Sequence, residues 1–276
     1  MLRQRILTAL VLLPLVVWGI VALPSPWLAL LFGAVVAQGG WEWSRLMRIE
    51  FGGLRLAYVA LVLSGMAGGW YLFAQGGEVW LALPVLSLFW WLMALVWVLT
   101  FPRTSSRWSN PVVQGVIGLL VLLPAWVAVI GLHASHGGLG PWLLLYMLSL
   151  IWVADSGAYF GGRRWGRRKL APAVSPGKSW EGVYSALALT GLYALLAAWL
   201  FGLGGKQWPA FVILSLVTVM FSILGDLSES MFKRHAGVKD SGTLLPGHGG
   251  VLDRIDSITS AAPVFVVGFW LGDFQL

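Results

Sequence analysis

The residues best suited to chemistry in this 276-residue chain lie close together in its C-terminal part, although only 11% of all residues are charged. Asp226, Ser230 and Lys233 are spaced at i, i+4 and i+7, so a helix would place them on one face. A carboxylate can hold a hard cation such as Mg²⁺, and an ammonium group can neutralise phosphate oxygens. Phosphoryl or nucleotidyl transfer requires this combination, because that chemistry depends mainly on positioning and charge neutralisation.

A polar loop predicted over residues 229–257 continues the same chemistry. Its further candidate residues are Arg234, Lys239, Asp240, His248, Gly249, Gly250, Asp253, Arg254 and Asp256. Glycines on both sides of His248 let the backbone come close to a ligand and turn N–H groups toward phosphate oxygens. Asp256 has an alternative role as a first-turn acid that suits a helix dipole. A solvated loop with incidental charges is the competing interpretation, but the concentration of charge in so apolar a chain favours a site.

A second polar loop is predicted over residues 162–181. Lys178 and Ser179 precede an apolar stretch, where a helix N-terminus could bind phosphate. The Gly-Lys-Ser sequence is not a phosphate-binding loop of the Walker type, because Pro172 occupies the position of the required earlier glycine and no strand is expected before it. Arg167 and Arg168 are expected, by default, to anchor a span and attract anionic lipid.

The elements that must position these residues are predicted to be membrane-spanning helices. Hydrophobic residues make up 58% of the chain, the mean hydropathy is +0.82, and there are 18 Trp. This composition excludes a soluble enzyme and a disordered chain, and the absence of Cys excludes disulfides, thiolate metal sites and Cys nucleophiles. A bilayer core takes roughly 20 apolar residues per helix. The predicted fold is therefore all-α and polytopic, with about nine spans, over residues 6–23, 27–44, 57–75, 79–101, 112–132, 141–161, 182–203, 209–228 and 258–272.

The positions of the basic residues predict the orientation in the membrane. All of the 18 Lys and Arg residues except Lys206 lie on one side of the predicted spans. The positive-inside rule then places the N-terminus in the cytoplasm and the C-terminus outside, with the active site facing the cytoplasm from the cell membrane. The net charge of +7 is therefore explained by the basic residues that orient the spans in the membrane. Nucleic acid is not an expected partner. Residues 1–135 are predicted to be a scaffold, and residues 136–276 the catalytic region.

Three predicted spans carry an acid: Glu42, Asp155 and Asp226. A carboxylate at membrane depth is costly and usually faces a bundle interior or a watery cavity. For Glu42, pairing with Arg45 at i+3 and a functional role are equally open. Asp155 is followed by small residues that would let another helix or a ligand approach closely. A multispan transporter with proton- or cation-carrying acids is an alternative, but it leaves the charged loop without a purpose.

The residues between Ser230 and Asp256 resemble the signature of the phosphatidate cytidylyltransferases, also called CDP-diacylglycerol synthases. Every position of that signature is filled, namely Ser230, Lys233-Arg234, Lys239-Asp240, His248-Gly249-Gly250, Asp253-Arg254 and Asp256. The segments 41–43, 155–159 and 175–182 are also similar to the family. The resemblance implies a reaction in which phosphatidic acid and CTP give CDP-diacylglycerol and pyrophosphate. A membrane enzyme that transfers nucleotidyl or phosphoryl groups to a polyprenol remains an alternative.

The resemblance implies roles for individual residues. Catalytic roles fall to Asp226, Ser230, Lys233, Lys239, Asp240, His248, Arg254 and Asp256. Substrate-binding roles fall to Asp155, Lys178, Ser179, Arg234, Gly249 and Gly250. Asp226 and Asp253 are the expected ligands of Mg²⁺, and a second cation is left open. The expected partners are CTP, phosphatidic acid and the lipid bilayer, and a homodimer is left open.

Overall fold

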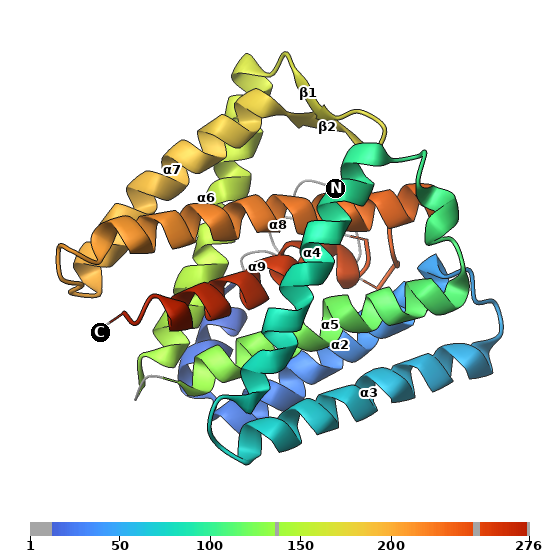
Figure 1. The fold of residues 1–276 in the computed structure, drawn as a ribbon, viewed down its shortest axis with the longest axis horizontal. Helices are drawn as coiled ribbons and strands as arrows, with labels where there is room; N and C mark the ends of the chain where they lie inside the picture. The colour runs from blue at the N-terminus through green and yellow to red at the C-terminus, as the bar shows by residue number, and fades with distance from the viewer. Residues whose placement is uncertain (1–12, 136–137, 245–248, 275–276) are drawn as a thin grey trace.

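The computed structural model describes residues 13–135, 138–244 and 249–274 (Figure 1). In these ranges the structure is a bundle of helices, as predicted. An apolar helix over Leu13–Ala22 is followed by α2 (Ser25–Leu46), α3 (Gly52–Ala74), α4 (Ala82–Thr100), α5 (Pro111–Ala134), α6 (Gly140–Trp165), α7 (Trp180–Leu200), α8 (Trp208–Ala236) and α9 (Leu252–Leu271). Two short 3₁₀ helices, Val79–Leu81 and Ser105–Arg107, lie on either side of α4.

Six of the described helices are long and apolar enough to cross a membrane: α3, α4 together with its preceding 3₁₀ turn, α5, α6, α7 and α8. The other described helices coincide with predicted spans but fall short of that standard. Only residues 13–22 of the first are described, while α2 and α9 carry polar and charged residues at one end. The structure therefore supports a multi-pass membrane protein, and the full count of nine stays a prediction.

Helix α8 extends well past residue 228, where its span was predicted to end, and this extension builds part of the site. It continues to Ala236 and ends at Gly237, which adopts a left-handed conformation with φ of 77°. The N–H groups of Gly237 and Val238 donate to the carbonyls of Arg234 and Lys233, as at a glycine-terminated helix. Residues predicted to lie in a loop therefore lie on a helix, so Asp226, Ser230 and Lys233 share one face.

Between α6 and α7 the structure forms a short antiparallel hairpin, β1 (Lys169–Ala171) and β2 (Ser175–Ser179). The sequence pattern predicts a loop here and no strand before Lys178, and this prediction is wrong. The strands are too short for alternating hydrophobicity to reveal them. The Glu181 carboxylate, in the first turn of α7, accepts hydrogen bonds from the N–H groups of Arg167 and Arg168 at 3.0 and 3.2 Å. The hairpin is thereby attached to the start of α7.

Small residues allow the helices around the site to approach closely. Helix α6 packs on α7, and α8 packs on α9, as Figure 1 shows. A Cβ at Gly161 would collide with Ser185 of α7, and a Cβ at Gly225 would collide with Ser260 and the Asp256 carbonyl of α9. Such contacts are typical of helix pairs in membranes, where close packing replaces the hydrophobic effect.

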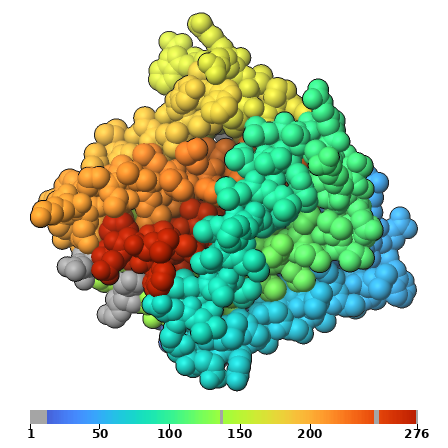
Figure 2. All heavy atoms as spheres, in the orientation of Figure 1, coloured from blue at the N-terminus to red at the C-terminus, as the bar shows by residue number. Residues whose placement is uncertain are grey.

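The N-terminal and C-terminal helices meet along α9. In Figure 2 the blue-to-green helices and the yellow-to-orange helices occupy different sides of the molecule, with α9 in red beside α4. Helix α9 packs on both α4 and α5, as well as on α8. The predicted division after residue 135 stays a prediction, but α9 joins the two parts and brings the first into contact with the polar residues of the second.

Candidate active site

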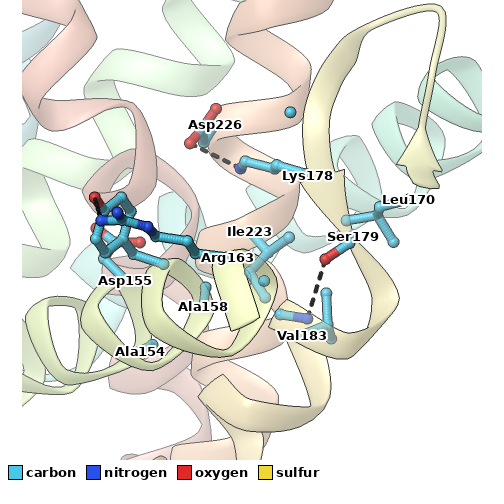
Figure 3. A pocket seen from close by; sticks show the side chains of 14 residues that line it. Ala154, Asp155, Ala158, Arg163, Leu170, Lys178, Ser179, Val183, Ile223 and Asp226 are labelled. Atoms are coloured by element: carbon cyan, nitrogen blue, oxygen red, sulfur yellow. Dashed lines mark hydrogen bonds and ion pairs between the residues drawn. The ribbon is translucent and has the colours of Figure 1, made fainter. Parts of the chain in front are cut away.

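A cavity of about 490 Å³ lies between α6, the hairpin, α7 and α8 (Figure 3). Lys178 extends into it from β2 and forms an ion pair with Asp226 of α8, with Nζ 2.7 Å from Oδ2. Asp155 and Arg163 of α6 also line this cavity. The structure therefore brings together Asp155, Lys178 and Asp226, which are far apart in the sequence and were predicted to belong to the site.

A second cavity, of about 430 Å³, lies between α6, α8, α9 and the segment before α9. Its ionisable lining residues are Asp155, Asp226, Lys233, Asp240, Asp253, Arg254 and Asp256. Asp155 and Asp226 line both cavities, so these two carboxylates lie where the cavities adjoin. Cationic side chains line each cavity, with Lys178 in the first and Lys233 and Arg254 in the second. The arrangement can hold two phosphate-bearing molecules side by side.

Lys233, which lines the second cavity, lies between two buried carboxylates. Its Nζ is 2.7 Å from Oε2 of Glu229 and 2.6 Å from Oδ1 of Asp253, and the two acidic side chains are only 4% and 6% exposed. The sequence analysis missed Glu229, although its spacing of i, i+4 to Lys233 on α8 was a usable signal. Lys233 joins α8 to the first turn of α9.

Asp253 is surrounded by hydrogen-bond donors. Its Oδ2 accepts from the N–H of Ser241 at 3.0 Å, the Ser241 hydroxyl at 2.9 Å and the N–H of Gly250 at 2.7 Å. The sequence analysis missed Ser241, because nothing in the local pattern separates it from other loop serines. The N–H of Gly250 was expected to face a phosphate, and in this structure it donates to Asp253.

Several other residues of the predicted site are not among those that line both cavities. Ser179 is buried and caps α7 by accepting a hydrogen bond from the N–H of Gly182 at 3.3 Å (Figure 3). Arg234 donates from Nε to the carbonyl of Val174 at 3.2 Å, which ties α8 to the hairpin. Lys239 is exposed, Gly249 has a φ of +86°, and His248 lies outside the described residues. The substrate roles of these residues stay predictions.

The donor set of the second cavity suits a hard divalent cation in chemistry, because Mg²⁺ prefers carboxylate oxygens. Asp226 contributes Oδ1, which accepts from the Ser230 hydroxyl at 3.3 Å, and Oδ2, which contacts Lys178. Over residues 13–135, 138–244 and 249–274, no three Asp, Glu or His side chains are grouped closely enough to hold an ion as they stand. The side chains of the second cavity therefore fit Mg²⁺ in the kind of ligand atom that they offer.

An apolar groove adjoins the second cavity. It has a volume of about 520 Å³ and is lined mainly by α6, α7 and Val17 of the first described helix. Trp152 of α6 lines both the groove and the second cavity. Trp152 therefore lies between the apolar groove and the cluster of charged residues.

Comparison with known proteins agrees with this geometry. A family model described as the cytidylyltransferase family matches residues 3–271. The chain belongs to this family. It is 47% identical over 270 residues to the phosphatidate cytidylyltransferase of Pseudomonas aeruginosa, with 98% of this chain and 97% of the relative covered. The phosphatidate cytidylyltransferase of Haemophilus influenzae is 42% identical over 286 residues, with 96% of this chain and 97% of the relative covered.

A third relative matches a smaller part of the chain. The phosphatidate cytidylyltransferase of Bacillus subtilis is 45% identical over 123 residues, which is 44% of either chain. The resemblance inferred from the residues between Ser230 and Asp256 is thus confirmed at the level of the family, and this chain is an enzyme of that family. The family match does not itself assign the roles of single residues.

Proposed function

We propose that this enzyme transfers CMP from CTP to phosphatidic acid, with CDP-diacylglycerol and pyrophosphate as products. The observation that carries the proposal is the pair of cavities that share Asp155 and Asp226, each with cationic side chains of its own. Two anionic substrates must be held close together for this reaction, and each needs positive charge around its phosphates. The relatives from Pseudomonas aeruginosa and Haemophilus influenzae, which match nearly the whole length of the chain, are phosphatidate cytidylyltransferases.

The reaction proceeds by direct displacement. A phosphate oxygen of phosphatidic acid attacks the α-phosphorus of CTP, the new P–O bond forms, and the bond to pyrophosphate breaks with its electron pair leaving on that group. Lys178, Lys233 and Arg254 orient the phosphates and neutralise their charge. No covalent enzyme intermediate is needed, which agrees with the absence of Cys. Positioning two substrates in this way supplies a large part of the rate enhancement that enzymes achieve.

Asp226 is the proposed principal ligand of Mg²⁺. It lines both cavities, and its known contacts are a weak hydrogen bond from Ser230 and the ion pair with Lys178. When bound, Mg²⁺ supplies positive charge to the phosphates where bonds change. Asp253 was predicted to be a second ligand, but its oxygens already bond to Lys233, Ser241 and Gly250. We therefore assign Asp253 to holding Lys233 and the loop.

The apolar groove is the proposed site of the phosphatidate acyl chains. It is lined mainly by aliphatic and aromatic side chains, and one of them, Trp152, also lines the charged cavity. A diacyl lipid bound this way keeps its chains out of water while its phosphate reaches the basic residues. Removing those chains from an apolar medium would cost about 0.8 kcal/mol for each CH₂ group.

An assay on the purified protein in proteoliposomes tests the function. We expect CTP and phosphatidic acid together to give CDP-diacylglycerol and pyrophosphate, while replacing CTP by ATP, or phosphatidic acid by a polyprenyl phosphate, gives little product. Product formation from the polyprenyl phosphate would favour the polyprenol-directed alternative. Ion flux without CTP consumption would favour a transporter and contradict the proposal.

The active site is proposed to face the cytoplasm, because the polar segments carry the basic residues that the positive-inside rule places there. The chain has no Cys, so single cysteines can be introduced without background. In Arg168→Cys we expect a membrane-impermeant maleimide to label only inside-out vesicles, and in Lys206→Cys only intact cells. Both side chains replaced are exposed. The reverse labelling pattern would contradict the orientation.

A further inference from the structure

Glu42 is a buried carboxylate in α2, far in the sequence from every other residue of the site. It is 2% exposed. Its Oε2 accepts hydrogen bonds from the Ser241 hydroxyl at 3.0 Å and the Leu252 N–H at 2.7 Å. Its Oε1 accepts from the Val251 N–H at 3.0 Å and from Gln38 at 3.2 Å. The structure shows no ion pair between the described side chains of Glu42 and Arg45, which the i+3 spacing had suggested.

These bonds make Glu42 the cap of α9. The first N–H groups of a helix have no partner within that helix, and negative charge is favourable beside them. The residue before α9, Val251, supplies no side-chain cap. Glu42 fills that place from another helix, because its carboxylate contacts the N–H groups of both Val251 and Leu252.

The close approach of the backbone to Glu42 also explains the glycines around this carboxylate. A Cβ added at Gly242 or Gly250 would collide with the carboxylate of Glu42. Glycine at these two positions therefore allows the backbone to close around Glu42. The glycines around His248 were expected to let the backbone approach a bound phosphate, whereas the atoms that fill the space at Gly250 belong to Glu42 and Ser241.

A chain of contacts leads from Glu42 to the substrate cavity. The Ser241 hydroxyl lies within hydrogen-bond distance of both Glu42 and Asp253, at 3.0 and 2.9 Å, and its one proton can serve either carboxylate. Asp253 in turn contacts Lys233 at 2.6 Å. Asp253 and Lys233 line the second cavity. The position of these two charged groups therefore depends on where Glu42 holds Ser241 and the start of α9.

We propose that Glu42 is a positioning residue of the transferase, which holds Ser241 and the start of α9 and so places Asp253 and Lys233 for substrate; this role rests on the proposed function. Glu42 lines neither of the two substrate cavities, so it acts through its partners. The N-terminal helices are then part of the active site's framework, since α2 supplies the group that fixes the loop.

Glu42→Gln tests the proposal with little change of volume. Both carboxylate oxygens face a backbone N–H, so either orientation of the amide directs its NH₂ group at a donor. We expect kcat/KM to fall by about tenfold to a hundredfold, the range for a misplacement of about 1 Å. We also expect a higher KM for at least one substrate and faster hydrogen exchange in peptides covering residues 249–254.

A matched control separates positioning from general loss of stability. Trp126→Phe removes another buried hydrogen bond to α2, the 3.1 Å bond from Trp126 Nε1 to the Ala29 carbonyl. We expect it to leave both KM values and the exchange of residues 249–254 unchanged. Ser241→Ala keeps the Glu42 cap but removes the hydroxyl bridge, so it provides a milder variant if Glu42→Gln does not accumulate. We expect Ser241→Ala to lower kcat/KM without exposing the Val251 and Leu252 amides.

The outcomes distinguish a failure of the positioning role of Glu42 from a failure of the proposed function. Unchanged exchange at residues 249–254 in Glu42→Gln would overturn the positioning role, as would a loss of activity with wild-type KM values and faster exchange throughout the protein. The exchange measurement does not depend on turnover. If the unmodified protein gave no CDP-diacylglycerol, the proposed function would fail while the contact between Glu42 and α9 could still be judged.

Discussion

We expect Asp226→Asn to lower kcat for CDP-diacylglycerol formation by about a thousandfold or more, a loss comparable to removing a principal electrostatic group from an active site. Asp226 is the carboxylate that lines both cavities and forms the 2.7 Å ion pair with Lys178. The amide keeps the shape but lacks the negative charge that would hold Mg²⁺ and orient Lys178. The measurement is the transfer of labelled CMP from CTP into lipid, normalised to the amount of protein in the membrane.

The matched control for this variant is Glu50→Gln, which makes the same change of charge at an exposed residue. We expect it to retain the wild-type rate. If Asp226→Asn accumulated in the membrane and turned over within about twofold of the wild type, the central role of Asp226 would be untenable; the twofold limit is well below the effect of losing any single electrostatic group.

The second large effect is expected for Lys233→Met. Glu229 and Asp253 are 4% and 6% exposed, and Lys233 is the cation that contacts both. Removing one partner from a buried ion pair leaves a charge without compensation and typically costs about 3–5 kcal/mol. We therefore expect both a lower thermal midpoint of the solubilised protein and a loss of transferase activity.

A double variant separates the two consequences of Lys233→Met. Adding Glu229→Gln removes one of the uncompensated carboxylates, so we expect it to recover part of the thermal midpoint but none of the activity, because no cation returns to the cavity. Lys206→Met serves as the control, since Lys206 is exposed. A thermal midpoint for Lys233→Met equal to that of Lys206→Met would show that the buried network does not stabilise the protein.

The helices and much of the site could be predicted from sequence because the signals are local. Apolar length indicates the spans, and the i, i+4, i+7 spacing places Asp226, Ser230 and Lys233 on one face of α8. The hairpin was missed because its strands, Lys169–Ala171 and Ser175–Ser179, are too short to show a pattern. Lys178 and Asp226 were both candidates, but their contact depends on how the hairpin lies against α8.

The partners of Glu42 could not be predicted, because they depend on packing between distant parts of the chain. The i+3 spacing offered Arg45 as one possible partner, whereas the structure pairs Glu42 with Ser241, Val251 and Leu252. Their donors are a hydroxyl and two backbone N–H groups, which carry no charge pattern in the sequence. The same holds for Asp253, whose Oδ2 is satisfied mostly by backbone N–H groups.

The distance along the chain between Glu42 and its partners also bears on how the protein is made. The bond to Leu252 joins residues 210 positions apart. At about 5–20 residues per second, a ribosome needs roughly 10–40 seconds to synthesise that interval. During this time the carboxylate is in or near the bilayer without α9, and Gln38, one turn earlier on α2, is the described partner already present. Packing of the start of α9 against α2 then completes the hydrogen bonding of Glu42, so this part of the framework can form only after residues 251 and 252 have been synthesised.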